Sequence, residues 1–487
     1  MRAKELIKSL DSCYLAGLED FEVKGISCNS KQVSDNFIFV AIEGTHIDGH
    51  KFIKEAIDKG ARIVIVQSSV TSHQSSEKVF FIRVNDTRKA LANLAAKFYG
   101  NPSSKIKVVG VTGTNGKTTV TYLIESLLKE AGLLPASIGT VNYRFKDKII
   151  PSKNTTPGPV ELQSFLADTV QENINYVIME VSSHALAQDR TGAIDFHSAI
   201  FTNLTQDHLD YHKTLEDYFQ VKAKLFKDMK YGSFAVINND DKYGKRLREL
   251  IRGPEIITYA IENEADIMAC DIKLDIPHTE FTLRAIKKEI NFKTRLIGRH
   301  NIYNILASFT WALKEGLDQN VVKSALERFD FIPGRLEKIK CRRDFSLFVD
   351  YAHTEDALTN VIGALRQISG NRIIVVFGCG GERDKTKRPK MGYAASELSD
   401  YVIITSDNPR SEDPQEIIKD IIKGIRKDNY SIIPDRKEAI AKSLSLAKAG
   451  DIVLIAGKGH ETYQILKNQT IHFDDREVVR ECLESMS

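Results

Sequence analysis

The chain has 487 residues, 42% of them hydrophobic and 27% charged, and its formal net charge is +3. This length exceeds a single hydrophobic core, so we expect two to four domains, and so small a net charge argues against a nucleic-acid-binding or membrane surface. The first residues lack the apolar core of a secretory signal, and no apolar run approaches the ~18 residues of a membrane span. The six cysteines form no Cys-x-x-Cys pair. We therefore expect a cytoplasmic protein with reduced thiols.

Residues 1–88 are expected to form a first α/β domain. Apolar runs at 37–41 and 62–66 predict buried strands, and residues 51–59 between them predict a helix that ends at Gly60. The polar, serine-rich stretch 67–78 predicts a loop. A helix predicted over residues 88–99 leads into the next unit.

Residues 89–331 are expected to form a central domain in which strands and helices alternate. Strands are predicted at 106–111, 176–181, 199–203 and 233–238, and a helix is predicted at 117–131. This alternation is typical of βαβ units, so we expect a parallel sheet.

Residues 332–487, which follow a Pro-Gly turn, are expected to form another α/β domain. Its strands are predicted at 346–350, 372–377, 401–405 and 451–456. Nearly every apolar strand of the last two domains runs directly into a polar cluster. Because ligands of open α/β sheets bind beyond the carboxyl ends of the strands, we expect the two domains to face one cleft.

The stretch GVTGTNGKTT, residues 110–119, lies between the first strand and the first helix of the central domain. It keeps the final Gly-Lys-Thr of the phosphate-binding pattern G-x-x-x-x-G-K-[ST], although Val111 replaces the first glycine. Backbone N–H groups at such a turn attract an anion, so we expect Lys117 to pair with nucleotide phosphates and Thr118 to bind Mg²⁺. A purely structural glycine turn is the alternative. A second glycine-rich stretch, 378–383, fails the dinucleotide pattern because Arg383 occupies its sixth position.

Two further side chains are candidates for metal binding. Glu180 ends a predicted strand beside the loop, and His208 lies in the polar sequence QDHLD. A helix-cap or turn carboxylate is the alternative for Glu180, and a satisfied loop histidine is the alternative for His208. Mg²⁺ prefers oxygen ligands shared with phosphate, so the residues alone indicate an ATP-dependent enzyme without separating kinase, ATPase and ligase.

Taken together, the motifs resemble those of the Mur ligase family. They are GTNGKTT (113–119), NTTPG (154–158), MEVSSHALAQDR (179–190), TNLTQDHLDYH (202–212), YFQVKAKLF (218–226), GRHNIYNILAS (298–308), PGRLE (333–337), VDYAHTEDAL (349–358), GCGGERDKTKRP (378–389), DNPRSEDP (407–414) and AGKGHE (456–461). The resemblance implies an α/β protein of three domains: a uridine-binding domain, a central P-loop ATPase domain and a Rossmann-like domain that binds an amino acid.

The family reaction forms an amide bond. ATP phosphorylates the carboxylate of a UDP-linked muramoyl dipeptide, and the amine of an amino acid attacks the acyl phosphate. The resemblance implies two Mg²⁺ ions and a carbamate on Lys222, four residues after Tyr218, which would turn a cation into a metal ligand. A lysine adds CO₂ only as a neutral amine, so its pKa must be lowered. Without the resemblance, Lys222 would be a solvated helix lysine, and Lys224 is the local competitor for the carbamate.

The resemblance also assigns residues to four groups. Those expected to be catalytic are Lys117, Glu180, His208 and Lys222, and those expected to bind metal are Thr118, Glu180, His208 and carbamylated Lys222. The ATP set is Gly113, Thr114, Asn115, Gly116, Lys117, Thr118, Thr119, Asn304, Arg335 and Asp350. The UDP-muramoyl-dipeptide set is Ser30, Thr155, Thr156, Ser182, Gln188, Arg190 and His353, and the amino-acid set is Arg383, Asp407, Asn408, Arg410, Gly457 and Glu461.

The resemblance implies meso-diaminopimelate as the amino acid, because family members that use it tend to carry Asp-Asn-Pro-Arg, which here is Asp407-Asn408-Pro409-Arg410, whereas lysine users tend to lack that arginine. This amino acid is lysine with an added distal carboxylate, which a bidentate Arg410 fits, whereas the terminal ammonium of lysine would be repelled. Addition of L-lysine is the alternative, as is a related amide ligase such as a folylpolyglutamate synthase. We expect a monomer that acts on small molecules in the bacterial cytoplasm.

Overall fold

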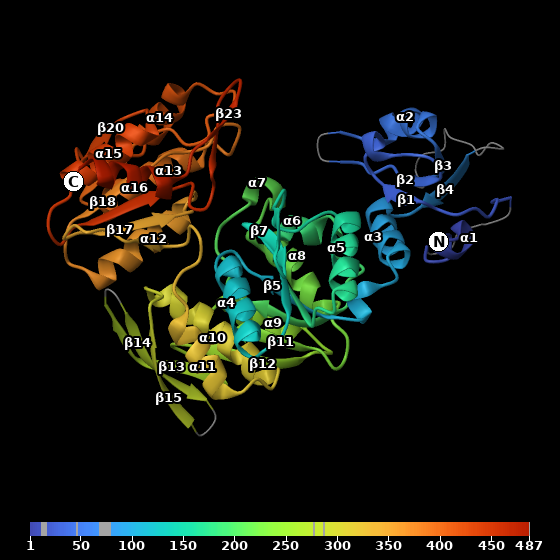
Figure 1. Cartoon of the computed structure of the whole chain (residues 1–487), viewed down its shortest axis with the longest axis horizontal. Coiled ribbons are helices and arrows are strands. Elements are labelled where there is room, and N and C mark those ends of the chain that lie inside the picture. Colours follow the sequence, from blue (N-terminus) through green and yellow to red (C-terminus); the bar gives the residue numbers. More distant parts are fainter. Residues whose placement is uncertain (11–16, 45–46, 68–78, 276–277, 286–287, 487) are drawn as a thin grey trace.

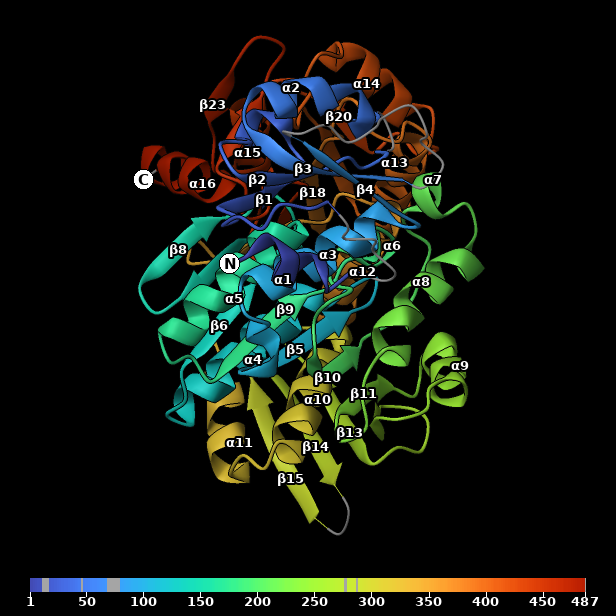
Figure 2. The ribbon, with the colours of Figure 1, turned by 90° about the vertical axis from the view of Figure 1, so that its right-hand side faces the viewer.

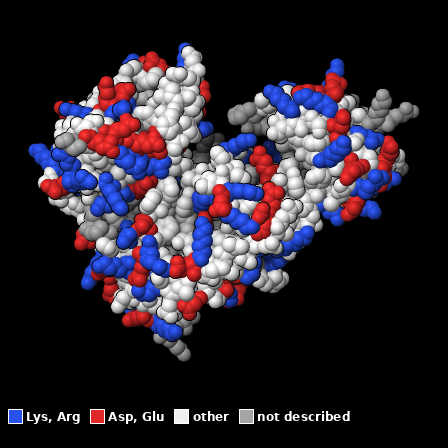
Figure 3. Space-filling model, in the orientation of Figure 1, with Lys and Arg blue, Asp and Glu red and all other residues white. Residues whose placement is uncertain are grey.

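The computed structural model describes residues 1–10, 17–44, 47–67, 79–275, 278–285 and 288–486. Figure 1 shows three lobes in chain order: the N-terminal lobe, the central lobe and the C-terminal lobe. Both outer lobes contact the central one, and Figure 3 shows a notch between them at the top of the molecule. Acidic and basic side chains are interspersed over the face shown in Figure 3, as the small net charge predicts.

The N-terminal lobe contains a parallel four-stranded sheet in the order β1-β2-β3-β4. Its elements are α1 (Ala3–Ile7), β1 (Gly25–Ser27), β2 (Phe37–Val40), α2 (Ile53–Asp58), β3 (Ala61–Gln67), β4 (Phe80–Val84) and α3 (Thr87–Phe98). The two predicted strands and the helix between them are confirmed. The predicted loop at 67–78 lies, beyond Gln67, outside the described residues.

Helix α3 spans the expected domain boundary between residues 88 and 89. The helix begins because the side chain of Asp86 accepts hydrogen bonds from the backbone N–H groups of Arg88 and Lys89. Ala90, Leu91 and Leu94 are buried in the same core as the N-terminal sheet. We therefore propose that the first domain extends to the end of α3.

The central lobe contains an eleven-stranded sheet in the order β15-β14-β13-β12-β11-β10-β5-β9-β6-β7-β8. Its strands are β5 (Lys107–Thr112), β6 (Pro135–Ile138), β7 (Asn142–Phe145), β8 (Lys148–Pro151), β9 (Tyr176–Glu180), β10 (Phe196–Phe201), β11 (Phe234–Asn238), β12 (Glu255–Ala260), β13 (Ile267–Leu274), β14 (Thr279–Ala285) and β15 (Lys288–Thr294). Its helices are α4 (Lys117–Glu130), α5 (Pro159–Gln171), α6 (Ser183–Ala187), α7 (Leu209–His212), α8 (Leu215–Lys227), α9 (Lys242–Leu250), α10 (Arg299–Lys314) and α11 (Gln319–Arg328). Two separate cores, one with α4 and α10 and the other with α5 and α8, bury the two faces of the sheet.

The prediction of a parallel sheet is correct for the middle of this sheet and wrong at its edges. The four predicted strands are confirmed as β5, β9, β10 and β11, which lie side by side in parallel. At one edge β7 and β8 run antiparallel, and at the other β14 and β15 do. The latter pair projects at the bottom of Figures 1 and 2.

The C-terminal lobe contains a six-stranded sheet in the order β16-β17-β21-β18-β19-β20, parallel except for β16. Its strands are β16 (Glu337–Ile339), β17 (Ser346–Asp350), β18 (Ile373–Phe377), β19 (Tyr401–Ile404), β20 (Tyr430–Ile432) and β21 (Ile452–Ala456), followed by the hairpin β22 (Tyr463–Ile465) and β23 (Thr470–His472). Its helices are α12 (Glu355–Ile368), α13 (Lys387–Leu398), α14 (Pro414–Ile422), α15 (Arg436–Leu446) and α16 (Asp475–Ser485). All four predicted strands are confirmed, and helices cover both faces.

Candidate functional site

A cleft of about 550 Å³ lies between the central and C-terminal lobes. The central lobe contributes residues that follow the carboxyl ends of β5, β9, β10 and β11, and the C-terminal lobe contributes residues at the end of β17 and the start of α12. This is the place where open parallel sheets bind ligands, as the sequence predicted. Among the predicted residues it brings together are Lys117, Thr118, Thr155, Glu180, Ser182, His208, Lys222, Asn304, Arg335, Asp350 and His353.

The loop predicted to bind nucleotide phosphates, residues 113–119, leads from β5 into α4 and is called the nucleotide loop below. Its path depends on two glycines. Gly113 has a φ of +150°, and a side-chain β-carbon there would lie 1.9 Å from the hydroxyl oxygen of Thr202. Gly116 has a φ of +86°, and a β-carbon there would lie 2.4 Å from the amide oxygen of Asn304. Only glycine fits either position, so the loop backbone can follow the tight path that aims N–H groups into the cleft.

Lys117 lies in the first turn of α4, and its ammonium folds back over the loop. Its Nζ donates to the carbonyl oxygens of Gly113, at 2.9 Å, and Thr114, at 2.8 Å. Burial lowers the pKa of Lys117, while the carboxylates of Glu180 and Asp207 oppose that shift. The lysine is thus a cation held at the mouth of the loop, where a phosphate would displace the carbonyl groups as its partner.

Glu180 lies at the end of β9 and is a buried carboxylate of the cleft. Its Oε2 accepts hydrogen bonds from the hydroxyls of Thr118 and Thr140, both at 3.0 Å, and its Oε1 accepts one from the backbone N–H of Thr140 at 2.9 Å. The side chain is only 1% exposed. The alternative of a helix-cap carboxylate is therefore not what the structure shows, because Glu180 bonds to the loop threonine and to the next chain segment.

Lys222 projects from α8 into the floor of the cleft and is 1% exposed. Its Nζ donates to the carbonyl oxygen of Gly113 at 2.9 Å, so one oxygen accepts from Lys222 and Lys117 together. Burial lowers the pKa of Lys222 well below its ordinary value, and repulsion by Lys117 lowers it further. The alternative of a solvated helix lysine is wrong for Lys222 and right for Lys224, whose side chain is 48% exposed.

His208 lines the same cleft on the loop that follows β10. Its ring nitrogen Nε2 lies 3.4 Å from a carboxylate oxygen of Asp207, and its backbone has a left-handed φ of +53°. The ring also makes an edge contact with Tyr218, whose hydroxyl lies 3.3 Å from that of Thr114. The segment after β10 thus brings the imidazole of His208 and the carboxylate of Asp207 to the same cleft as the nucleotide loop.

Arg335 and Asp350 bring the C-terminal lobe to the nucleotide loop. The guanidinium of Arg335 donates to the hydroxyl of Thr118 at 3.5 Å, and its buried Nε has no hydrogen-bond partner among the described residues. Asp350 accepts from the backbone N–H groups of Leu336 at 2.5 Å and Ala352 at 2.7 Å, and burial raises the pKa of its carboxyl. Asn304, on α10, abuts the loop at Gly116.

Four of the residues predicted to hold the muramoyl peptide form a chain of hydrogen bonds that begins at Ser182 on the cleft and runs through Thr156 and Arg190 to Gln188, which do not line the cleft. Thr156 donates to the carbonyl of Glu180 at 2.8 Å and accepts from the backbone N–H of Ser182 at 3.1 Å. The guanidinium of Arg190 donates to the carbonyl of Thr156 at 2.9 Å and to the side chain of Gln188 at 2.7 Å. Thr155 contacts Thr140, and His353 lines the opposite wall. Ser30 lies apart in the N-terminal lobe, where its hydroxyl donates to Glu55 at 2.7 Å.

The residues predicted to bind the amino acid form a second group, in the C-terminal lobe beyond β18, β19 and β21. None of them lines the cleft described above. Asn408 donates to Glu461 at 2.9 Å, and Arg410 donates to the carbonyl of Gly381 at 2.7 Å. Arg410 has a left-handed φ of +55°, and a β-carbon on Gly380 would lie 3.1 Å from its guanidinium and 3.7 Å from Arg383. Gly457, with a φ of +114°, lies beside the carboxylate of Asp407.

Sequence reasoning missed three residues of these groups. Thr140 ties Glu180 in place, and the carboxylate of Asp356, at the start of α12, accepts from Asn115 at 2.8 Å and from Thr205 at 3.0 Å. Lys458 is fully buried under Asn408 and Glu461. The position of Lys458 between two glycines directly after an apolar strand was the signal available for it.

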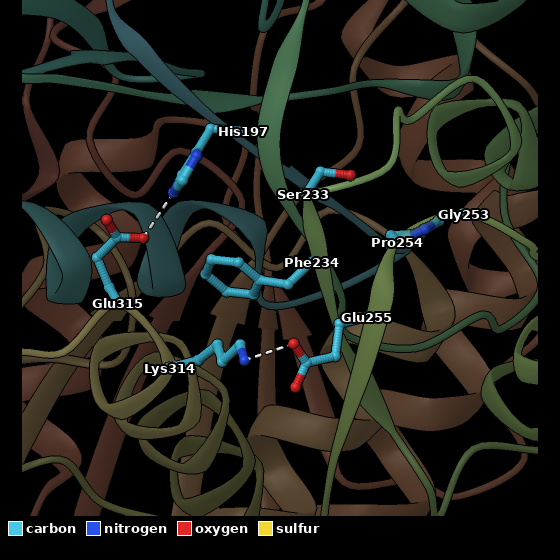
Figure 4. Close-up of a pocket in the computed structure, with 9 residues that line it drawn as sticks. His197, Ser233, Phe234, Gly253, Pro254, Glu255, Lys314 and Glu315 are labelled. Carbon is cyan, nitrogen blue, oxygen red and sulfur yellow. Dashed lines mark hydrogen bonds and ion pairs between the residues drawn. The ribbon is translucent and has the colours of Figure 1, made fainter.

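A second cavity, of about 460 Å³, lies at the amino ends of the central strands (Figure 4). Its charged side chains are paired with each other. His197 lies 2.7 Å from Glu315, and Lys314 lies 2.6 Å from Glu255. It contains none of the predicted site residues. Over the described part of the chain, no helix has the length and apolar character to cross a membrane.

Comparison with known proteins gives the same picture along the whole chain. Family models described as the Mur ligase family catalytic domain, the Mur ligase middle domain and the Mur ligase glutamate ligase domain match residues 22–99, 111–312 and 334–459. A Clostridium tetani protein named UDP-N-acetylmuramoyl-L-alanyl-D-glutamate–2,6-diaminopimelate ligase is 44% identical over 490 residues and covers 100% of both chains. An Aquifex aeolicus protein of the same name is 46% identical, covering 95% of this chain and 94% of its own.

Comparison with solved structures gives matches to the same family. One with that same name in its title has a TM-score of 0.67 and 32% identity, with 95% of each chain covered. A folylpolyglutamate synthase of Mycobacterium tuberculosis, solved with ADP and AMPPCP, has a TM-score of 0.64 but only 16% identity and covers 76% of this chain, so it shows the fold alone. With three family models in order along the sequence and relatives matched from end to end, this chain belongs to the Mur ligase family.

Proposed function

We infer that this chain is an ATP-dependent ligase that joins meso-2,6-diaminopimelate to UDP-N-acetylmuramoyl-L-alanyl-D-glutamate, a step in peptidoglycan precursor synthesis. The observation that carries this inference is the end-to-end similarity, at 44% identity, to a ligase named for these two substrates. The cleft agrees with it, because a nucleotide loop, a buried carboxylate and a buried lysine face one another there.

The nucleotide loop would hold the phosphates of ATP. Its residues are Gly113, Thr114, Asn115, Gly116, Lys117, Thr118 and Thr119. Lys117 would exchange its two loop carbonyls for phosphate oxygens, and Arg335 would bring a second cation from the C-terminal lobe. Two cations beside the transferred group lower the repulsion between ATP and the substrate carboxylate. Asn304 and Asp350 complete the proposed ATP set.

The donor set around Glu180 fits Mg²⁺. Thr118 and Glu180 offer oxygen atoms beside the phosphate loop, which is what a hard cation prefers. No three His, Cys, Asp or Glu side chains among the described residues group into a metal site, so further ligands must come from phosphate, His208 or a modified Lys222. Bound there, the ions would supply charge neutralisation to the phosphoryl group. We propose two ions.

Lys222 is proposed to carry the carbamate. Its neutral amine can attack CO₂, forming an N–C bond and releasing a proton, and the product is an anion. The environment supports the neutral amine, since burial and the nearby cation Lys117 both disfavour the ammonium. The carbamate would then place an oxygen ligand opposite Glu180.

The acyl substrate would lie along the wall that runs from Thr155 to Arg190. Thr156, Ser182, Gln188 and Arg190 already form a hydrogen-bonded chain there, and Thr155 bonds to Thr140, which fixes the side chains that would meet the peptide. His353 would face the same peptide from the opposite wall. Ser30, in the first lobe, would contact the uracil. These assignments give the three lobes their roles: uridine binding, ATP binding and amino-acid binding.

Arg410 is the proposed determinant of diaminopimelate. A distal carboxylate would accept from its guanidinium with help from Arg383, while Asp407, Asn408, Gly457 and Glu461 would meet the neighbouring ammonium. L-lysine has the distal ammonium without the distal carboxylate, so it would leave the guanidinium of Arg410 without an anionic partner. We also propose that the enzyme is a monomer and acts in the bacterial cytoplasm.

The test is phosphate release from ATP with UDP-N-acetylmuramoyl-L-alanyl-D-glutamate and Mg²⁺, with meso-diaminopimelate, L-lysine or L-glutamate as the amine. We expect release with diaminopimelate. Arg410→Ala should lower kcat/KM for diaminopimelate by roughly 10- to 100-fold, since hydrogen bonds between charged groups contribute about 1.5–3 kcal/mol. Arg342→Ala, an exposed arginine of the same lobe, is the control. A preference for lysine would refute the role of Arg410, and activity only with a folate and glutamate would refute the substrate.

A further inference from the structure

The most unusual buried charge outside the nucleotide cleft is Lys458, in the loop after β21. Its side chain is 0% exposed, although lysine is among the residues least often buried. Its Nζ donates to the amide oxygen of Asn408 at 3.1 Å and to a carboxylate oxygen of Glu461 at 3.4 Å, and it lies 3.5 Å from a carboxylate oxygen of Asp407. One ammonium therefore touches three residues of the proposed amino-acid group.

The contacts of Lys458 also fix the orientation of Asn408. The amide oxygen of Asn408 accepts from Lys458 and from the backbone N–H of Ile465 at 2.9 Å. Its amide nitrogen must then point the other way, and it donates to Glu461 at 2.9 Å. Lys458 reinforces this orientation together with Ile465, because a flipped amide would turn its N–H groups toward these two donors and its oxygen toward the carboxylate of Glu461.

Charge balance gives Lys458 a second effect. Asp407 and Glu461 are two largely buried carboxylates within 3.5 Å of the same ammonium. By formal charge, Lys458 offsets one of the two carboxylates, so the three side chains of Asp407, Glu461 and Lys458 together carry one net negative charge. A ligand ammonium supplies the missing positive charge.

We propose that Lys458 is a positioning residue for the amino-acid substrate, which orients Asn408 and Glu461 and keeps the carboxylates ready to accept the distal ammonium of a diamino acid. The inference rests on the proposed function, because it assumes that this group binds the amine substrate. Lys458 itself is buried and does not touch that substrate. It differs from a purely structural ion pair in that its removal should affect one substrate only.

The experiment measures kcat and the KM of each of the three substrates for the wild type, Lys458→Met, Lys458→Arg and Lys467→Met. Activity of the wild type with diaminopimelate is measured first, and its absence would refute the proposed function itself. Lys467→Met is the matched control, because Lys467 is an exposed lysine in the adjoining turn between β22 and β23.

We expect Lys458→Met to raise the KM for diaminopimelate by at least about tenfold, while kcat and the KM for ATP stay within about threefold of the wild type. Lys458→Arg keeps the charge with a different shape, so its KM should lie between those of the wild type and Lys458→Met. An unchanged KM for diaminopimelate would overturn the proposal. An equal loss in all parameters, together with a lower melting temperature, would also overturn it, since that is the result of a structural ion pair.

If Lys458→Met does not fold, Lys458→Arg decides the question alone. A KM raised for diaminopimelate only supports the positioning role, and a KM equal to that of the wild type refutes it.

Discussion

At the scale of single residues, the carbonyl oxygen of Gly113 organises the site. It accepts hydrogen bonds from Lys117 and Lys222, which come from different helices, and the two amines cannot both be charged there at low cost. The sequence shows both lysines but nothing of this shared partner. Only the fold, which brings α8 under the nucleotide loop, separates the buried Lys222 from the exposed Lys224.

Carbamylation should therefore be selective for one lysine. With ¹³C-bicarbonate at pH 8, we expect one carbamate resonance in the ¹³C spectrum of the wild type. The resonance should be absent from Lys222→Met and retained in Lys224→Met. Ligase activity should be lost in Lys222→Met, which lacks the resonance, and retained in Lys224→Met. A carbamate signal that persists in Lys222→Met would contradict the assignment of the carbamate to Lys222.

The same burial predicts how stability depends on pH in CO₂-free buffer. The pKa of Lys222 is lower in the folded protein than its ordinary value of 10.5, so the unfolded chain binds the proton more tightly. Stability from this group therefore falls as the pH drops from about 10.5 toward the folded pKa. Lys222→Met should melt at a higher temperature than the wild type at pH 7, and the difference should shrink toward pH 10. Lys224→Met should show no such convergence.

At the scale of elements, the first turn of α12 connects the C-terminal lobe to the nucleotide loop. The carboxylate of Asp356 accepts from Asn115 in the loop, from Thr205 in the segment after β10, and from Asn360 one turn later at 3.2 Å. One side chain thus joins a helix of one lobe to two strand-end loops of another. Asp356 lies in the motif VDYAHTEDAL (349–358), but no role was assigned to it from the sequence, because its partners come from distant parts of the chain.

Asp356→Ala should loosen this connection. Loss of the shared acceptor removes two hydrogen bonds between the lobes, so we expect a larger radius of gyration in small-angle X-ray scattering and faster proteolysis near residues 329–335. Glu355→Ala removes a carboxylate from the same helical turn and serves as the control for the helix dipole. Scattering curves that coincide for Asp356→Ala and the wild type would show that the contact does not hold the lobes.

The strands predicted from the sequence were those in the middle of the sheets. Such strands are buried on both faces and read as continuous apolar runs, as in Ile373–Phe377. The edge strands alternate instead. In the edge strand Lys288–Thr294, buried residues alternate with exposed ones from Ile290 to Thr294, and a search for apolar runs passes over such a pattern. The candidate site residues were predicted on a different basis. Glycine, lysine and threonine at fixed spacing indicate a phosphate-binding loop even without knowledge of the fold.

At the scale of the molecule, the two proposed substrate groups are separate in this conformation. Glu180 and Lys222 line the cleft, whereas Asn408 and Arg410 lie outside it on the C-terminal lobe. Formation of an amide bond requires the amine to reach the activated carboxylate, so the lobes must approach each other. The division into three lobes was predictable from chain length and motifs, but their relative placement was not, because no local pattern encodes it.

Closure should be visible in solution. We expect the radius of gyration to decrease when a non-hydrolysable ATP analogue, Mg²⁺ and the UDP-linked dipeptide are added together, and to decrease less with the nucleotide alone. Addition of EDTA should reverse the change. Identical scattering in all states would contradict a closing motion.

A carbamate on Lys222 would couple dissolved CO₂ to nucleotide affinity through the shared acceptor at Gly113. Lys222 as an ammonium repels Lys117, whereas Lys222 as a carbamate would attract it. The carbamate would also add a ligand for the metal that accompanies ATP. Any such effect of one ligand on another is reciprocal. If the carbamate tightens ATP binding, ATP must stabilise the carbamate by the same factor, and the enzyme's apparent nucleotide affinity becomes a function of the inorganic carbon in the cell.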